Sequence, residues 1–213
     1  DDNNKVISLI NDWSVGKDVE INVNDVNLGL KKNILYGINA TFKNYENAIF
    51  LEDDLEVSEY FLDFMNNSLE LYKNKNNVKH ISGFNYPTFL KDSDSSYFTP
   101  YMNCWGWATW RRCWSQYITH QQLWEEVKAS PSFQQSMFED PLERQYWITI
   151  WEKLFSTGIP DSWAYRWSLV CMANSGLTIL PNQNLVTNIG FGDDATHTTG
   201  LATAVETSGL PNI

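Results

Sequence analysis

The stretch Ala48-Ile49-Phe50-Leu51-Glu52-Asp53-Asp54 is the most informative part of the chain, because four apolar residues run directly into three carboxylates. An apolar run of this length is typical of a buried strand and is too short for a helix. A helical pattern precedes it, so the sequence predicts an α/β fold with a parallel sheet. Ligands of such sheets bind beyond the carboxyl ends of the strands, where Glu52, Asp53 and Asp54 would lie.

Three adjacent carboxylates repel one another unless a cation or hydrogen-bond donors compensate their charge. A hard divalent cation with oxygen ligands is the simplest compensation, which makes Glu52, Asp53 and Asp54 candidate metal- or ligand-binding residues. The other interpretation is an acidic turn in solvent that begins the next helix, where the positive end of the helix dipole favours acids. The residues by themselves leave both interpretations open.

The amino-acid composition limits the classes of function that the chain can have. The chain has 213 residues, enough for one domain with a substantial core, and its 15 Lys and Arg against 26 Asp and Glu give a formal net charge of -11. This charge argues against a nucleic-acid partner, which needs a basic face, and against simple electrostatic docking on anionic lipid. The sequence shows no apolar run long enough to span a bilayer and no signal peptide.

The cysteine and aromatic residues bear on the compartment of the protein and on its possible ligands. Cys104, Cys113 and Cys171 form no CxxC pair, so the sequence suggests neither a disulfide framework nor a zinc site and favours a reducing compartment. There are 10 Trp, 10 Tyr and 11 Phe, and indole faces stack on sugars and nucleobases but also fill cores. The first residue is Asp1 rather than Met, which suggests a fragment or a processed chain.

Local patterns predict the remaining elements. Helices are expected at 4–12, 30–42, 58–72, 110–114, 143–155 and 163–174, and further strands at 18–23, 79–84 and 177–181. Residues 85–100, with two prolines and a Ser/Asp cluster, are expected to form a loop. Ser58 is expected to cap the third of these helices, and Asp161 or Ser162 the last. His80 is expected to be a structural histidine.

Two motifs allow a functional and a structural interpretation. Lys31 and Lys32 fall on the first turn of the helix at 30–42, where cations oppose the helix dipole; they either meet an anion or are simply solvated. In Trp105-Gly106-Trp107, glycine between two indoles would let a ligand approach the backbone while an indole stacks on it. The same three residues would also suit a tight turn in an aromatic core.

Taken in order, these motifs resemble the nucleotide-diphospho-sugar transferases of GT-A fold, in particular bacterial relatives of N-acetylglucosaminyltransferase I. The match runs from about residue 20 to 198 and is specific in its combination rather than in any single motif. The matching stretches are Asn27-Leu28-Gly29-Leu30, Leu51-Glu52-Asp53-Asp54, the helix at 58–72, Ser82-Gly83-Phe84-Asn85, Cys104-Trp105-Gly106-Trp107-Ala108-Thr109-Trp110, Ser162-Trp163 with Tyr165 and Trp167, Pro181 through Asn184-Leu185-Val186, Asn188-Ile189-Gly190-Phe191-Gly192 and Ala195-Thr196-His197.

The resemblance implies a donor site at the acidic triplet. Asp54 would bind Mn²⁺ or Mg²⁺, which bridges the donor diphosphate, and His197 corresponds to the family's late histidine near the metal. Glu52 and Asp53 would face the ribose and sugar of the nucleotide-diphospho-sugar, and Lys32 is assigned to the same donor. The metal would stabilise charge on the leaving diphosphate, with inversion at the anomeric carbon.

The resemblance also implies an acceptor pocket and a catalytic base. The acceptor-binding residues would be Trp105, Gly106, Trp107 and Trp163. Relatives usually carry Trp-Asp where this chain has Trp163-Ala164, so Asp161, three residues earlier, is expected to serve as the base; its other interpretation is a helix N-cap. The family's first strand, helix and strand would precede residue 1, so we expect a single, partial GT-A domain over residues 1–213 with a mixed, Rossmann-like sheet flanked by helices.

The leading hypothesis is a metal-dependent inverting glycosyltransferase, a hexosyl- or N-acetylhexosaminyltransferase of polysaccharide biosynthesis. Its partners would be a nucleotide-diphospho-sugar donor and a glycan or lipid-linked sugar acceptor, with no nucleic acid and no transmembrane segment. We expect it in the cytoplasm, or at the inner face of the membrane through peripheral association. The alternatives are a catalytically silent GT-A remnant that binds a glycan, and a structural domain that binds neither ligand. A hydrolase with paired carboxylates has no support beyond the acids themselves.

Overall fold

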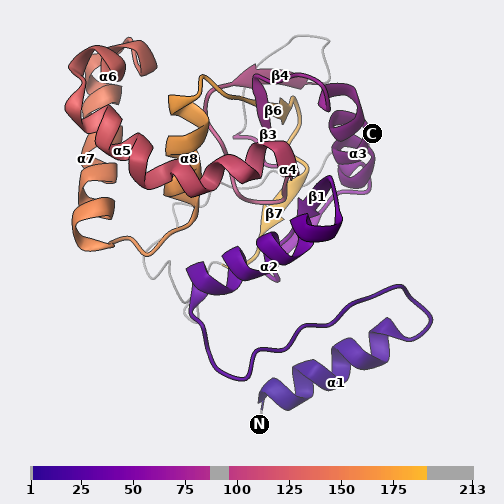
Figure 1. Ribbon diagram of the computed structural model, residues 1–213. Helices are drawn as coiled ribbons and strands as arrows, with labels where there is room; N and C mark the ends of the chain where they lie inside the picture. Colours follow the sequence, from indigo (N-terminus) through magenta and orange to yellow (C-terminus); the bar gives the residue numbers. More distant parts are fainter. Residues whose placement is uncertain (1, 87–95, 191–213) are drawn as a thin grey trace.

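The computed structural model (Figure 1) describes residues 2–86 and 96–190, which form an α/β fold with two sheets and flanking helices. The helices are α1 (Asp2–Ser14), α2 (Leu30–Asn44), α3 (Phe61–Tyr72), α4 (Arg111–Trp114), the 3₁₀ helix η1 (Ser115–Thr119), α5 (His120–Ala129), α6 (Pro131–Met137), α7 (Pro141–Thr157) and α8 (Ala164–Ala173). The strands are β1 (Asn47–Phe50), β2 (Leu55–Val57), β3 (Val78–Ser82), β4 (Ser96–Thr99), β5 (Trp107–Trp110), β6 (Leu177–Pro181) and β7 (Val186–Asn188).

The larger sheet has five strands in the order β1-β5-β3-β6-β4. Neighbouring strands are antiparallel, except that β3 and β6 run parallel with Ile81 beside Ile179. The predicted strand before the acidic triplet is confirmed as β1, but the prediction of a parallel sheet is wrong. The reason is β5, which lies between β1 and β3 and pairs with both in the antiparallel sense, Ala48 facing Thr109. Within the described residues β1 is therefore an edge strand, and its apolar residues are only half-buried.

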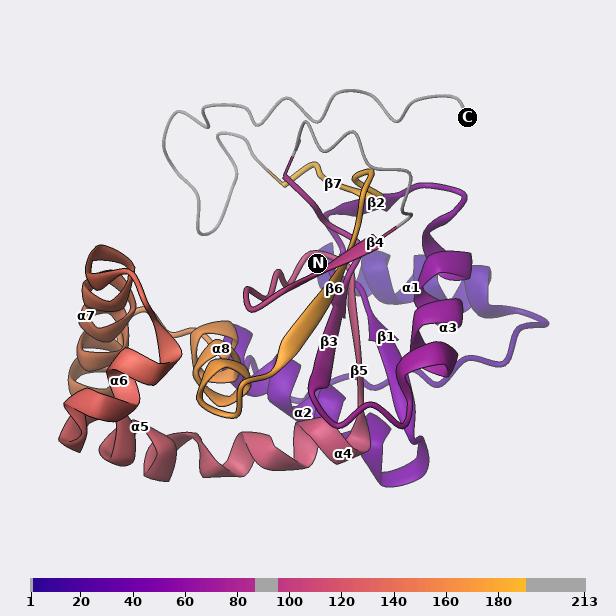
Figure 2. The same cartoon turned by 90° about the horizontal axis from the view of Figure 1, so that it is seen from above.

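Helices cover both faces of this sheet, as Figure 2 shows from above. α3 packs on one face, against β3 and β5, while α2 and α8 lie on the opposite face. α5, α6 and α7 form an outer group that is joined to the sheet through α8. The α/β class with a mixed sheet flanked by helices is thus established for the described residues.

The smaller sheet joins two distant parts of the chain. β2 and β7 pair in the antiparallel sense, with Leu55 opposite Asn188 and Val57 opposite Val186. One residue beyond this ladder, the amide of Ile189 donates to the carbonyl of Asp54 at 2.8 Å. This pairing brings the end of the acidic triplet against Gly190, and it could not be read from local sequence patterns.

Most of the tryptophans are core residues. Seven of the ten are buried: Trp107, Trp110, Trp114, Trp124, Trp151, Trp163 and Trp167. One hydrophobic core lies between the large sheet and its helices, and a second lies between α5, α7 and α8. Trp110 and Trp114, expected to be core residues one helical turn apart, are 3% and 4% exposed. The structural interpretation of the aromatic content is therefore correct for the majority of the indoles.

Several local predictions are wrong in detail. Residues 18–23 form no strand despite the alternation of Val19, Ile21 and Val23, because none of the described strands pairs with them. α3 begins at Phe61 without a side-chain cap, and the amide of Ser58 instead donates to the carbonyl of Leu185 at 2.9 Å. The expected loop at 85–100 contains β4.

The start of α8 resolves the choice between two capping residues. Ser162 Oγ accepts hydrogen bonds from the amides of Ala164 and Tyr165, at 3.2 and 3.5 Å. Asp161 makes no such contact in the described structure. Ser162 is therefore the residue that caps α8. Across residues 2–86 and 96–190, no helix is both long enough and apolar enough to cross a membrane.

Candidate functional site

The acidic loop, Leu51–Asp54, connects the carboxyl end of β1 to β2. Glu52 and Asp54 are half-buried, whereas Asp53 is exposed. The loop leaves the sheet edge at the position expected for a ligand site in an α/β fold. The three carboxylates therefore stand where the sequence placed them, but they differ in their access to solvent.

Asp54 is the most constrained of the three. Its Oδ1 is buried and has no hydrogen-bond partner. Its other oxygen lies so close to Gly190 that a Cβ built on that glycine would come within 2.3 Å of Oδ2. A buried carboxylate oxygen without a partner is costly unless a cation or a donor group satisfies it. Asp54 is therefore suited to bind a cation or a hydrogen-bond donor that approaches this end of the sheet.

The acidic loop also carries uncompensated charge. Burial raises the pKa of Glu52, and the neighbouring carboxylates of Asp54 and Asp53 raise it further. A cation bound at the loop would reverse this effect, because a positive charge favours the ionised form.

The residues fit a divalent cation only in part. The described residues contain no group of three or more His, Cys, Asp or Glu side chains arranged to hold a metal ion. Mg²⁺ commonly binds through one or two carboxylates, with substrate phosphates and water completing its shell, and Asp54 with its unpartnered oxygen suits that mode. His197, the second predicted metal ligand, lies outside the described residues.

A cavity of about 310 Å³, which we call the aromatic cavity, lies near the acidic loop. Its lining consists of Phe84, Tyr86, Met102, Asn103, Cys104, Trp105, Trp147, Ser162, Ala164, Tyr165 and Ser168. The pKa of the Cys104 thiol is raised to about 12, first by burial and then by the charge of Glu52, with a smaller effect of Asp54. The cavity and the acidic loop are thus close enough to interact electrostatically.

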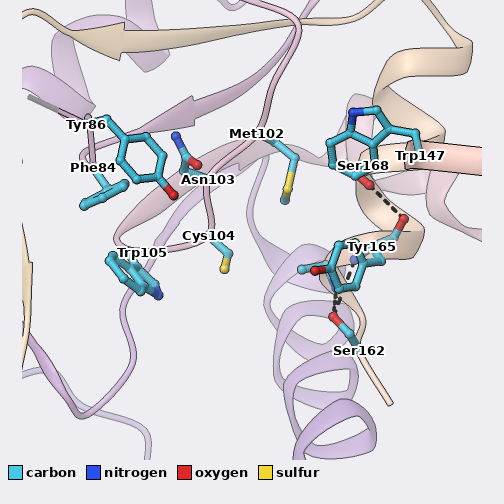
Figure 3. A pocket seen from close by; sticks show the side chains of 11 residues that line it. Phe84, Tyr86, Met102, Asn103, Cys104, Trp105, Trp147, Ser162, Tyr165 and Ser168 are labelled. Carbon is cyan, nitrogen blue, oxygen red and sulfur yellow. Dashed lines mark hydrogen bonds between the residues drawn. The ribbon is translucent and has the colours of Figure 1, made fainter. Parts of the chain in front are cut away.

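The aromatic cavity has two facing aromatic walls (Figure 3). Phe84, Tyr86 and Trp105 form one wall, with the ring of Phe84 edge-on to Trp105 at 4.6 Å between centroids. Trp147 and Tyr165, from α7 and α8, form the other wall. Met102 and Cys104 lie between the two walls. Such a slot suits a flat or pyranose-like ring that stacks on an aromatic face.

His80 links a residue of the cavity lining, Asn103, to Trp167 of α8. Its Nε2 lies 2.8 Å from the carbonyl oxygen of Asn103, and Trp167 Nε1 donates to its Nδ1 at 3.2 Å. Because Nδ1 accepts, the neutral ring carries its proton on Nε2 and donates it to Asn103. Burial lowers the pKa of His80 to about 4, so the ring is neutral at physiological pH. The expectation of a structural histidine is confirmed.

A second cavity of about 310 Å³, which we call the α2 cavity, lies between α2, the end of β1 and the start of α8. It is lined by Asn33, Ile34, Gly37, Ile38, Thr41, Phe50, Leu51, Glu52, Trp107 and Trp163. Trp107 and Trp163 are stacked at 5.0 Å and are only 2% and 3% exposed. Glu52 lines this cavity, and its charge also acts on Cys104 of the aromatic cavity.

The four predicted acceptor-binding residues therefore do not form one pocket. Trp105 lines the aromatic cavity, whereas Trp107 and Trp163 are core residues that wall the α2 cavity. Gly106 is buried at φ +57°, and a Cβ there would meet Val186 and Phe61 within 3 Å. Glycine at 106 is thus explained by a turn against the core and not by close approach of a ligand.

The remaining predicted site residues lie at the surface near the start of α2. Asp161 is exposed and ion-paired with Lys31, which lowers the pKa of Asp161. Lys32 is also exposed, and its charge contributes to the same lowering. None of these three residues is among the lining of either cavity. A solvated carboxylate with a lowered pKa is a weak general base, because proton abstraction becomes less favourable.

Sequence reasoning missed several lining residues of the aromatic cavity. Tyr86, Met102 and Trp147 carry no motif of their own, and their proximity depends on β3, β5 and α7 meeting at one place. Ala164 had been singled out, and it does line this cavity. Its place at the start of α8 is what brings it to the cavity.

Two comparisons with known proteins assign the chain to no family. No family model matches the sequence, and no curated protein matches it. The functional argument therefore depends on the site itself.

Proposed function

We propose that this chain is a metal-dependent glycosyltransferase of GT-A type, which moves a sugar from a nucleotide-diphospho-sugar to a glycan acceptor with inversion. One observation carries the proposal: an acidic loop with a buried, unpartnered Asp54 oxygen lies beside an aromatic cavity large enough for one sugar unit. A cation site next to a sugar-stacking slot is what transfer from a nucleotide-diphospho-sugar requires.

The acidic loop would bind the donor. Asp54 would hold Mn²⁺ or Mg²⁺ through the oxygen that lacks a partner. The bound cation would stabilise the negative charge on the leaving diphosphate. Glu52 would contact the donor from the lining of the α2 cavity, which would receive part of the donor. Lys32 and the start of α2 are in reach of an anionic group at the surface.

The aromatic cavity would bind the acceptor sugar between Trp105 and Tyr165. Proton transfer from the acceptor hydroxyl needs a carboxylate, and the predicted base is Asp161. To act on an acceptor in this cavity, Asp161 would have to leave Lys31, an exposed ion pair that is readily broken. The assignment of Asp161 therefore stays a prediction that activity measurements must decide.

The test is calorimetric titration of UDP- and GDP-sugars in the presence of Mn²⁺. We expect the wild-type chain to bind one of them only with metal present, and Asp54→Ala to lose that binding while keeping its circular dichroism spectrum. Asp63→Ala, which removes an exposed carboxylate from the first turn of α3, is the matched control and should bind as wild type. Equal binding by wild type and Asp54→Ala would remove Asp54 from the donor site.

A second candidate is a glycan-binding module without transferase activity. It is favoured by Ala164, because this position lines the aromatic cavity and none of the described lining residues is a carboxylate. Such a protein would bind a glycan in the absence of metal and nucleotide and would transfer nothing. Ala164→Asp separates the two: a gain of sugar transfer in this variant supports a transferase scaffold, and unchanged inactivity supports the binding module.

A further inference from the structure

The described residues that line the aromatic cavity carry no charge, which is unusual for this chain. Charged residues make up 19% of the sequence, and the formal net charge is -11. None of the described residues that line the aromatic cavity is Asp, Glu, Lys or Arg, and none is His. A bound carboxylate, sulfate or phosphate would thus find no cationic partner among these residues, although charge-assisted hydrogen bonds are the usual means of holding such groups.

Three polar atoms of the lining are bonded to the protein itself. Ser162 Oγ accepts from two backbone amides, and Ser168 Oγ donates to the carbonyl of Tyr165 at 2.8 Å. The carbonyl of Asn103 is bonded to His80. The lining can therefore offer stacking surfaces and neutral hydrogen bonds.

Charges of both signs lie close to the lining, because Arg166 Nη1 donates to the carbonyl of Ser162 at 2.7 Å while Glu52 and Asp54 act on Cys104. Burial raises the pKa of Cys104, and the carboxylates of Glu52 and Asp54 raise it further. The thiol is consequently protonated and neutral at physiological pH. The charge of Glu52 and Asp54 would repel an anionic group that entered between the two aromatic walls.

We infer that the aromatic cavity selects an uncharged sugar unit and rejects sugars that carry a carboxylate, sulfate or phosphate. The inference names the substrate class of the acceptor site and rests on the proposed function. Its geometric basis is the slot formed by Trp105 and Tyr86 on one side and Trp147 and Tyr165 on the other, with Met102 between them. The acceptor would accordingly be a neutral glycan.

The experiment compares two methyl glycosides that differ only at C6, methyl β-D-glucopyranoside and methyl β-D-glucuronide. Their affinities are measured at pH 7 by saturation-transfer NMR and by tryptophan fluorescence, without metal or nucleotide. We expect the neutral glycoside to bind at least roughly tenfold more tightly than the glucuronide. Equal affinities, tighter binding of the glucuronide, or binding of neither glycoside would overturn the inference.

Variants test whether the measured glycoside binding takes place in the aromatic cavity. Trp105→Ala removes part of one aromatic wall and should abolish glucoside binding, whereas Trp13→Ala, which removes an exposed indole on α1, should leave it unchanged. Met102→Lys introduces a cation between the walls and should raise glucuronide affinity, with Met102→Gln as the neutral control. If Trp105→Ala does not fold, the comparison of Met102→Lys with Met102→Gln tests the inference. An unchanged preference for the neutral glycoside in Met102→Lys would count against it.

This design separates the inference from the proposed function. Glycoside binding is measured without donor or metal, and donor binding is measured without glycoside. Loss of neutral-sugar preference with intact Mn²⁺-dependent nucleotide binding would overturn only the inference. Neutral-sugar binding without nucleotide binding would leave the inference standing and would favour the glycan-binding module.

Discussion

Acidification should destabilise the protein through one buried histidine. His80 is fully buried on β3, stacks on Trp107 with ring centroids 5.1 Å apart, and accepts a hydrogen bond from Trp167 at Nδ1. Protonation would place a positive charge in this apolar site and would turn the accepting nitrogen into a donor that faces another donor. The folded state therefore resists protonation far more strongly than the unfolded chain does.

The size of the effect follows from the two pKa values. The pKa of His80 is 6.5 as an ordinary histidine and about 4 in the folded protein. At about 1.4 kcal/mol for each tenfold change in proton affinity, the difference corresponds to about 3 kcal/mol of unfolding free energy. The lowered pKa fixes the sign: this stability is fully present above pH 6.5, is lost progressively as the pH falls, and is gone below pH 4.

The assay is urea unfolding followed by tryptophan fluorescence between pH 7 and pH 4, on wild type and His80→Gln. Glutamine can accept from Trp167 and donate to Asn103 but does not titrate. Glu52, whose pKa is raised, contributes in the opposite direction in both proteins and cancels in the difference. We expect the wild type to lose about 3 kcal/mol more than His80→Gln over this range.

Parallel pH profiles for the two proteins would refute the reasoning. Should His80→Gln be too unstable to measure, the ring protons of His80 provide the same test by NMR. A titration midpoint near pH 4 in the folded wild type supports the argument, and a midpoint near 6.5 contradicts it.

Further predictions concern substitutions at four single positions. Gly190→Ala should displace the Asp54 carboxylate and weaken any Mn²⁺ binding measured by calorimetry. A Cβ added at Gly37 meets no atom within 4 Å, so Gly37→Ala in helix α2 should raise the unfolding free energy by about 1 kcal/mol. Leu154→Ala should lower the unfolding free energy by about 2–5 kcal/mol in urea titrations, because Leu154 is fully buried beside Trp151. Asp161→Asn should leave the urea midpoint nearly unchanged, because its ion pair is exposed; a clear drop would contradict that account.

The parts of the fold that depend on residues close together in the sequence could be predicted. The strand ahead of Glu52 and the helices α2, α7 and α8 follow from unbroken apolar runs or a stripe at helical spacing. Strand partners could not be predicted. β5 lies beside β1, and β7 pairs with β2, through contacts between residues far apart in sequence. Residues 18–23 illustrate the limit, because a correct alternation forms no strand without a partner.

The candidate site, too, could be predicted from the sequence only in part. The acidic loop was placed correctly because it directly follows a strand. The resemblance predicts one pocket for Trp105 and Trp107. In the structure the turn at Gly106 separates them, and they line different cavities. Trp107 begins β5, whereas Trp105 lies before the turn at Gly106, where φ is +57°. Tyr86 and Trp147 reach the cavity only through tertiary packing.

The most direct test of the central claim is the thermal unfolding midpoint of this chain with Mn²⁺, measured with and without UDP or GDP. A ligand that binds only the folded state raises the midpoint by mass action. We predict a rise that requires both metal and nucleotide and that is lost in Asp54→Ala. A midpoint that no combination of metal and nucleotide changes would contradict the assignment of the acidic loop as a donor site.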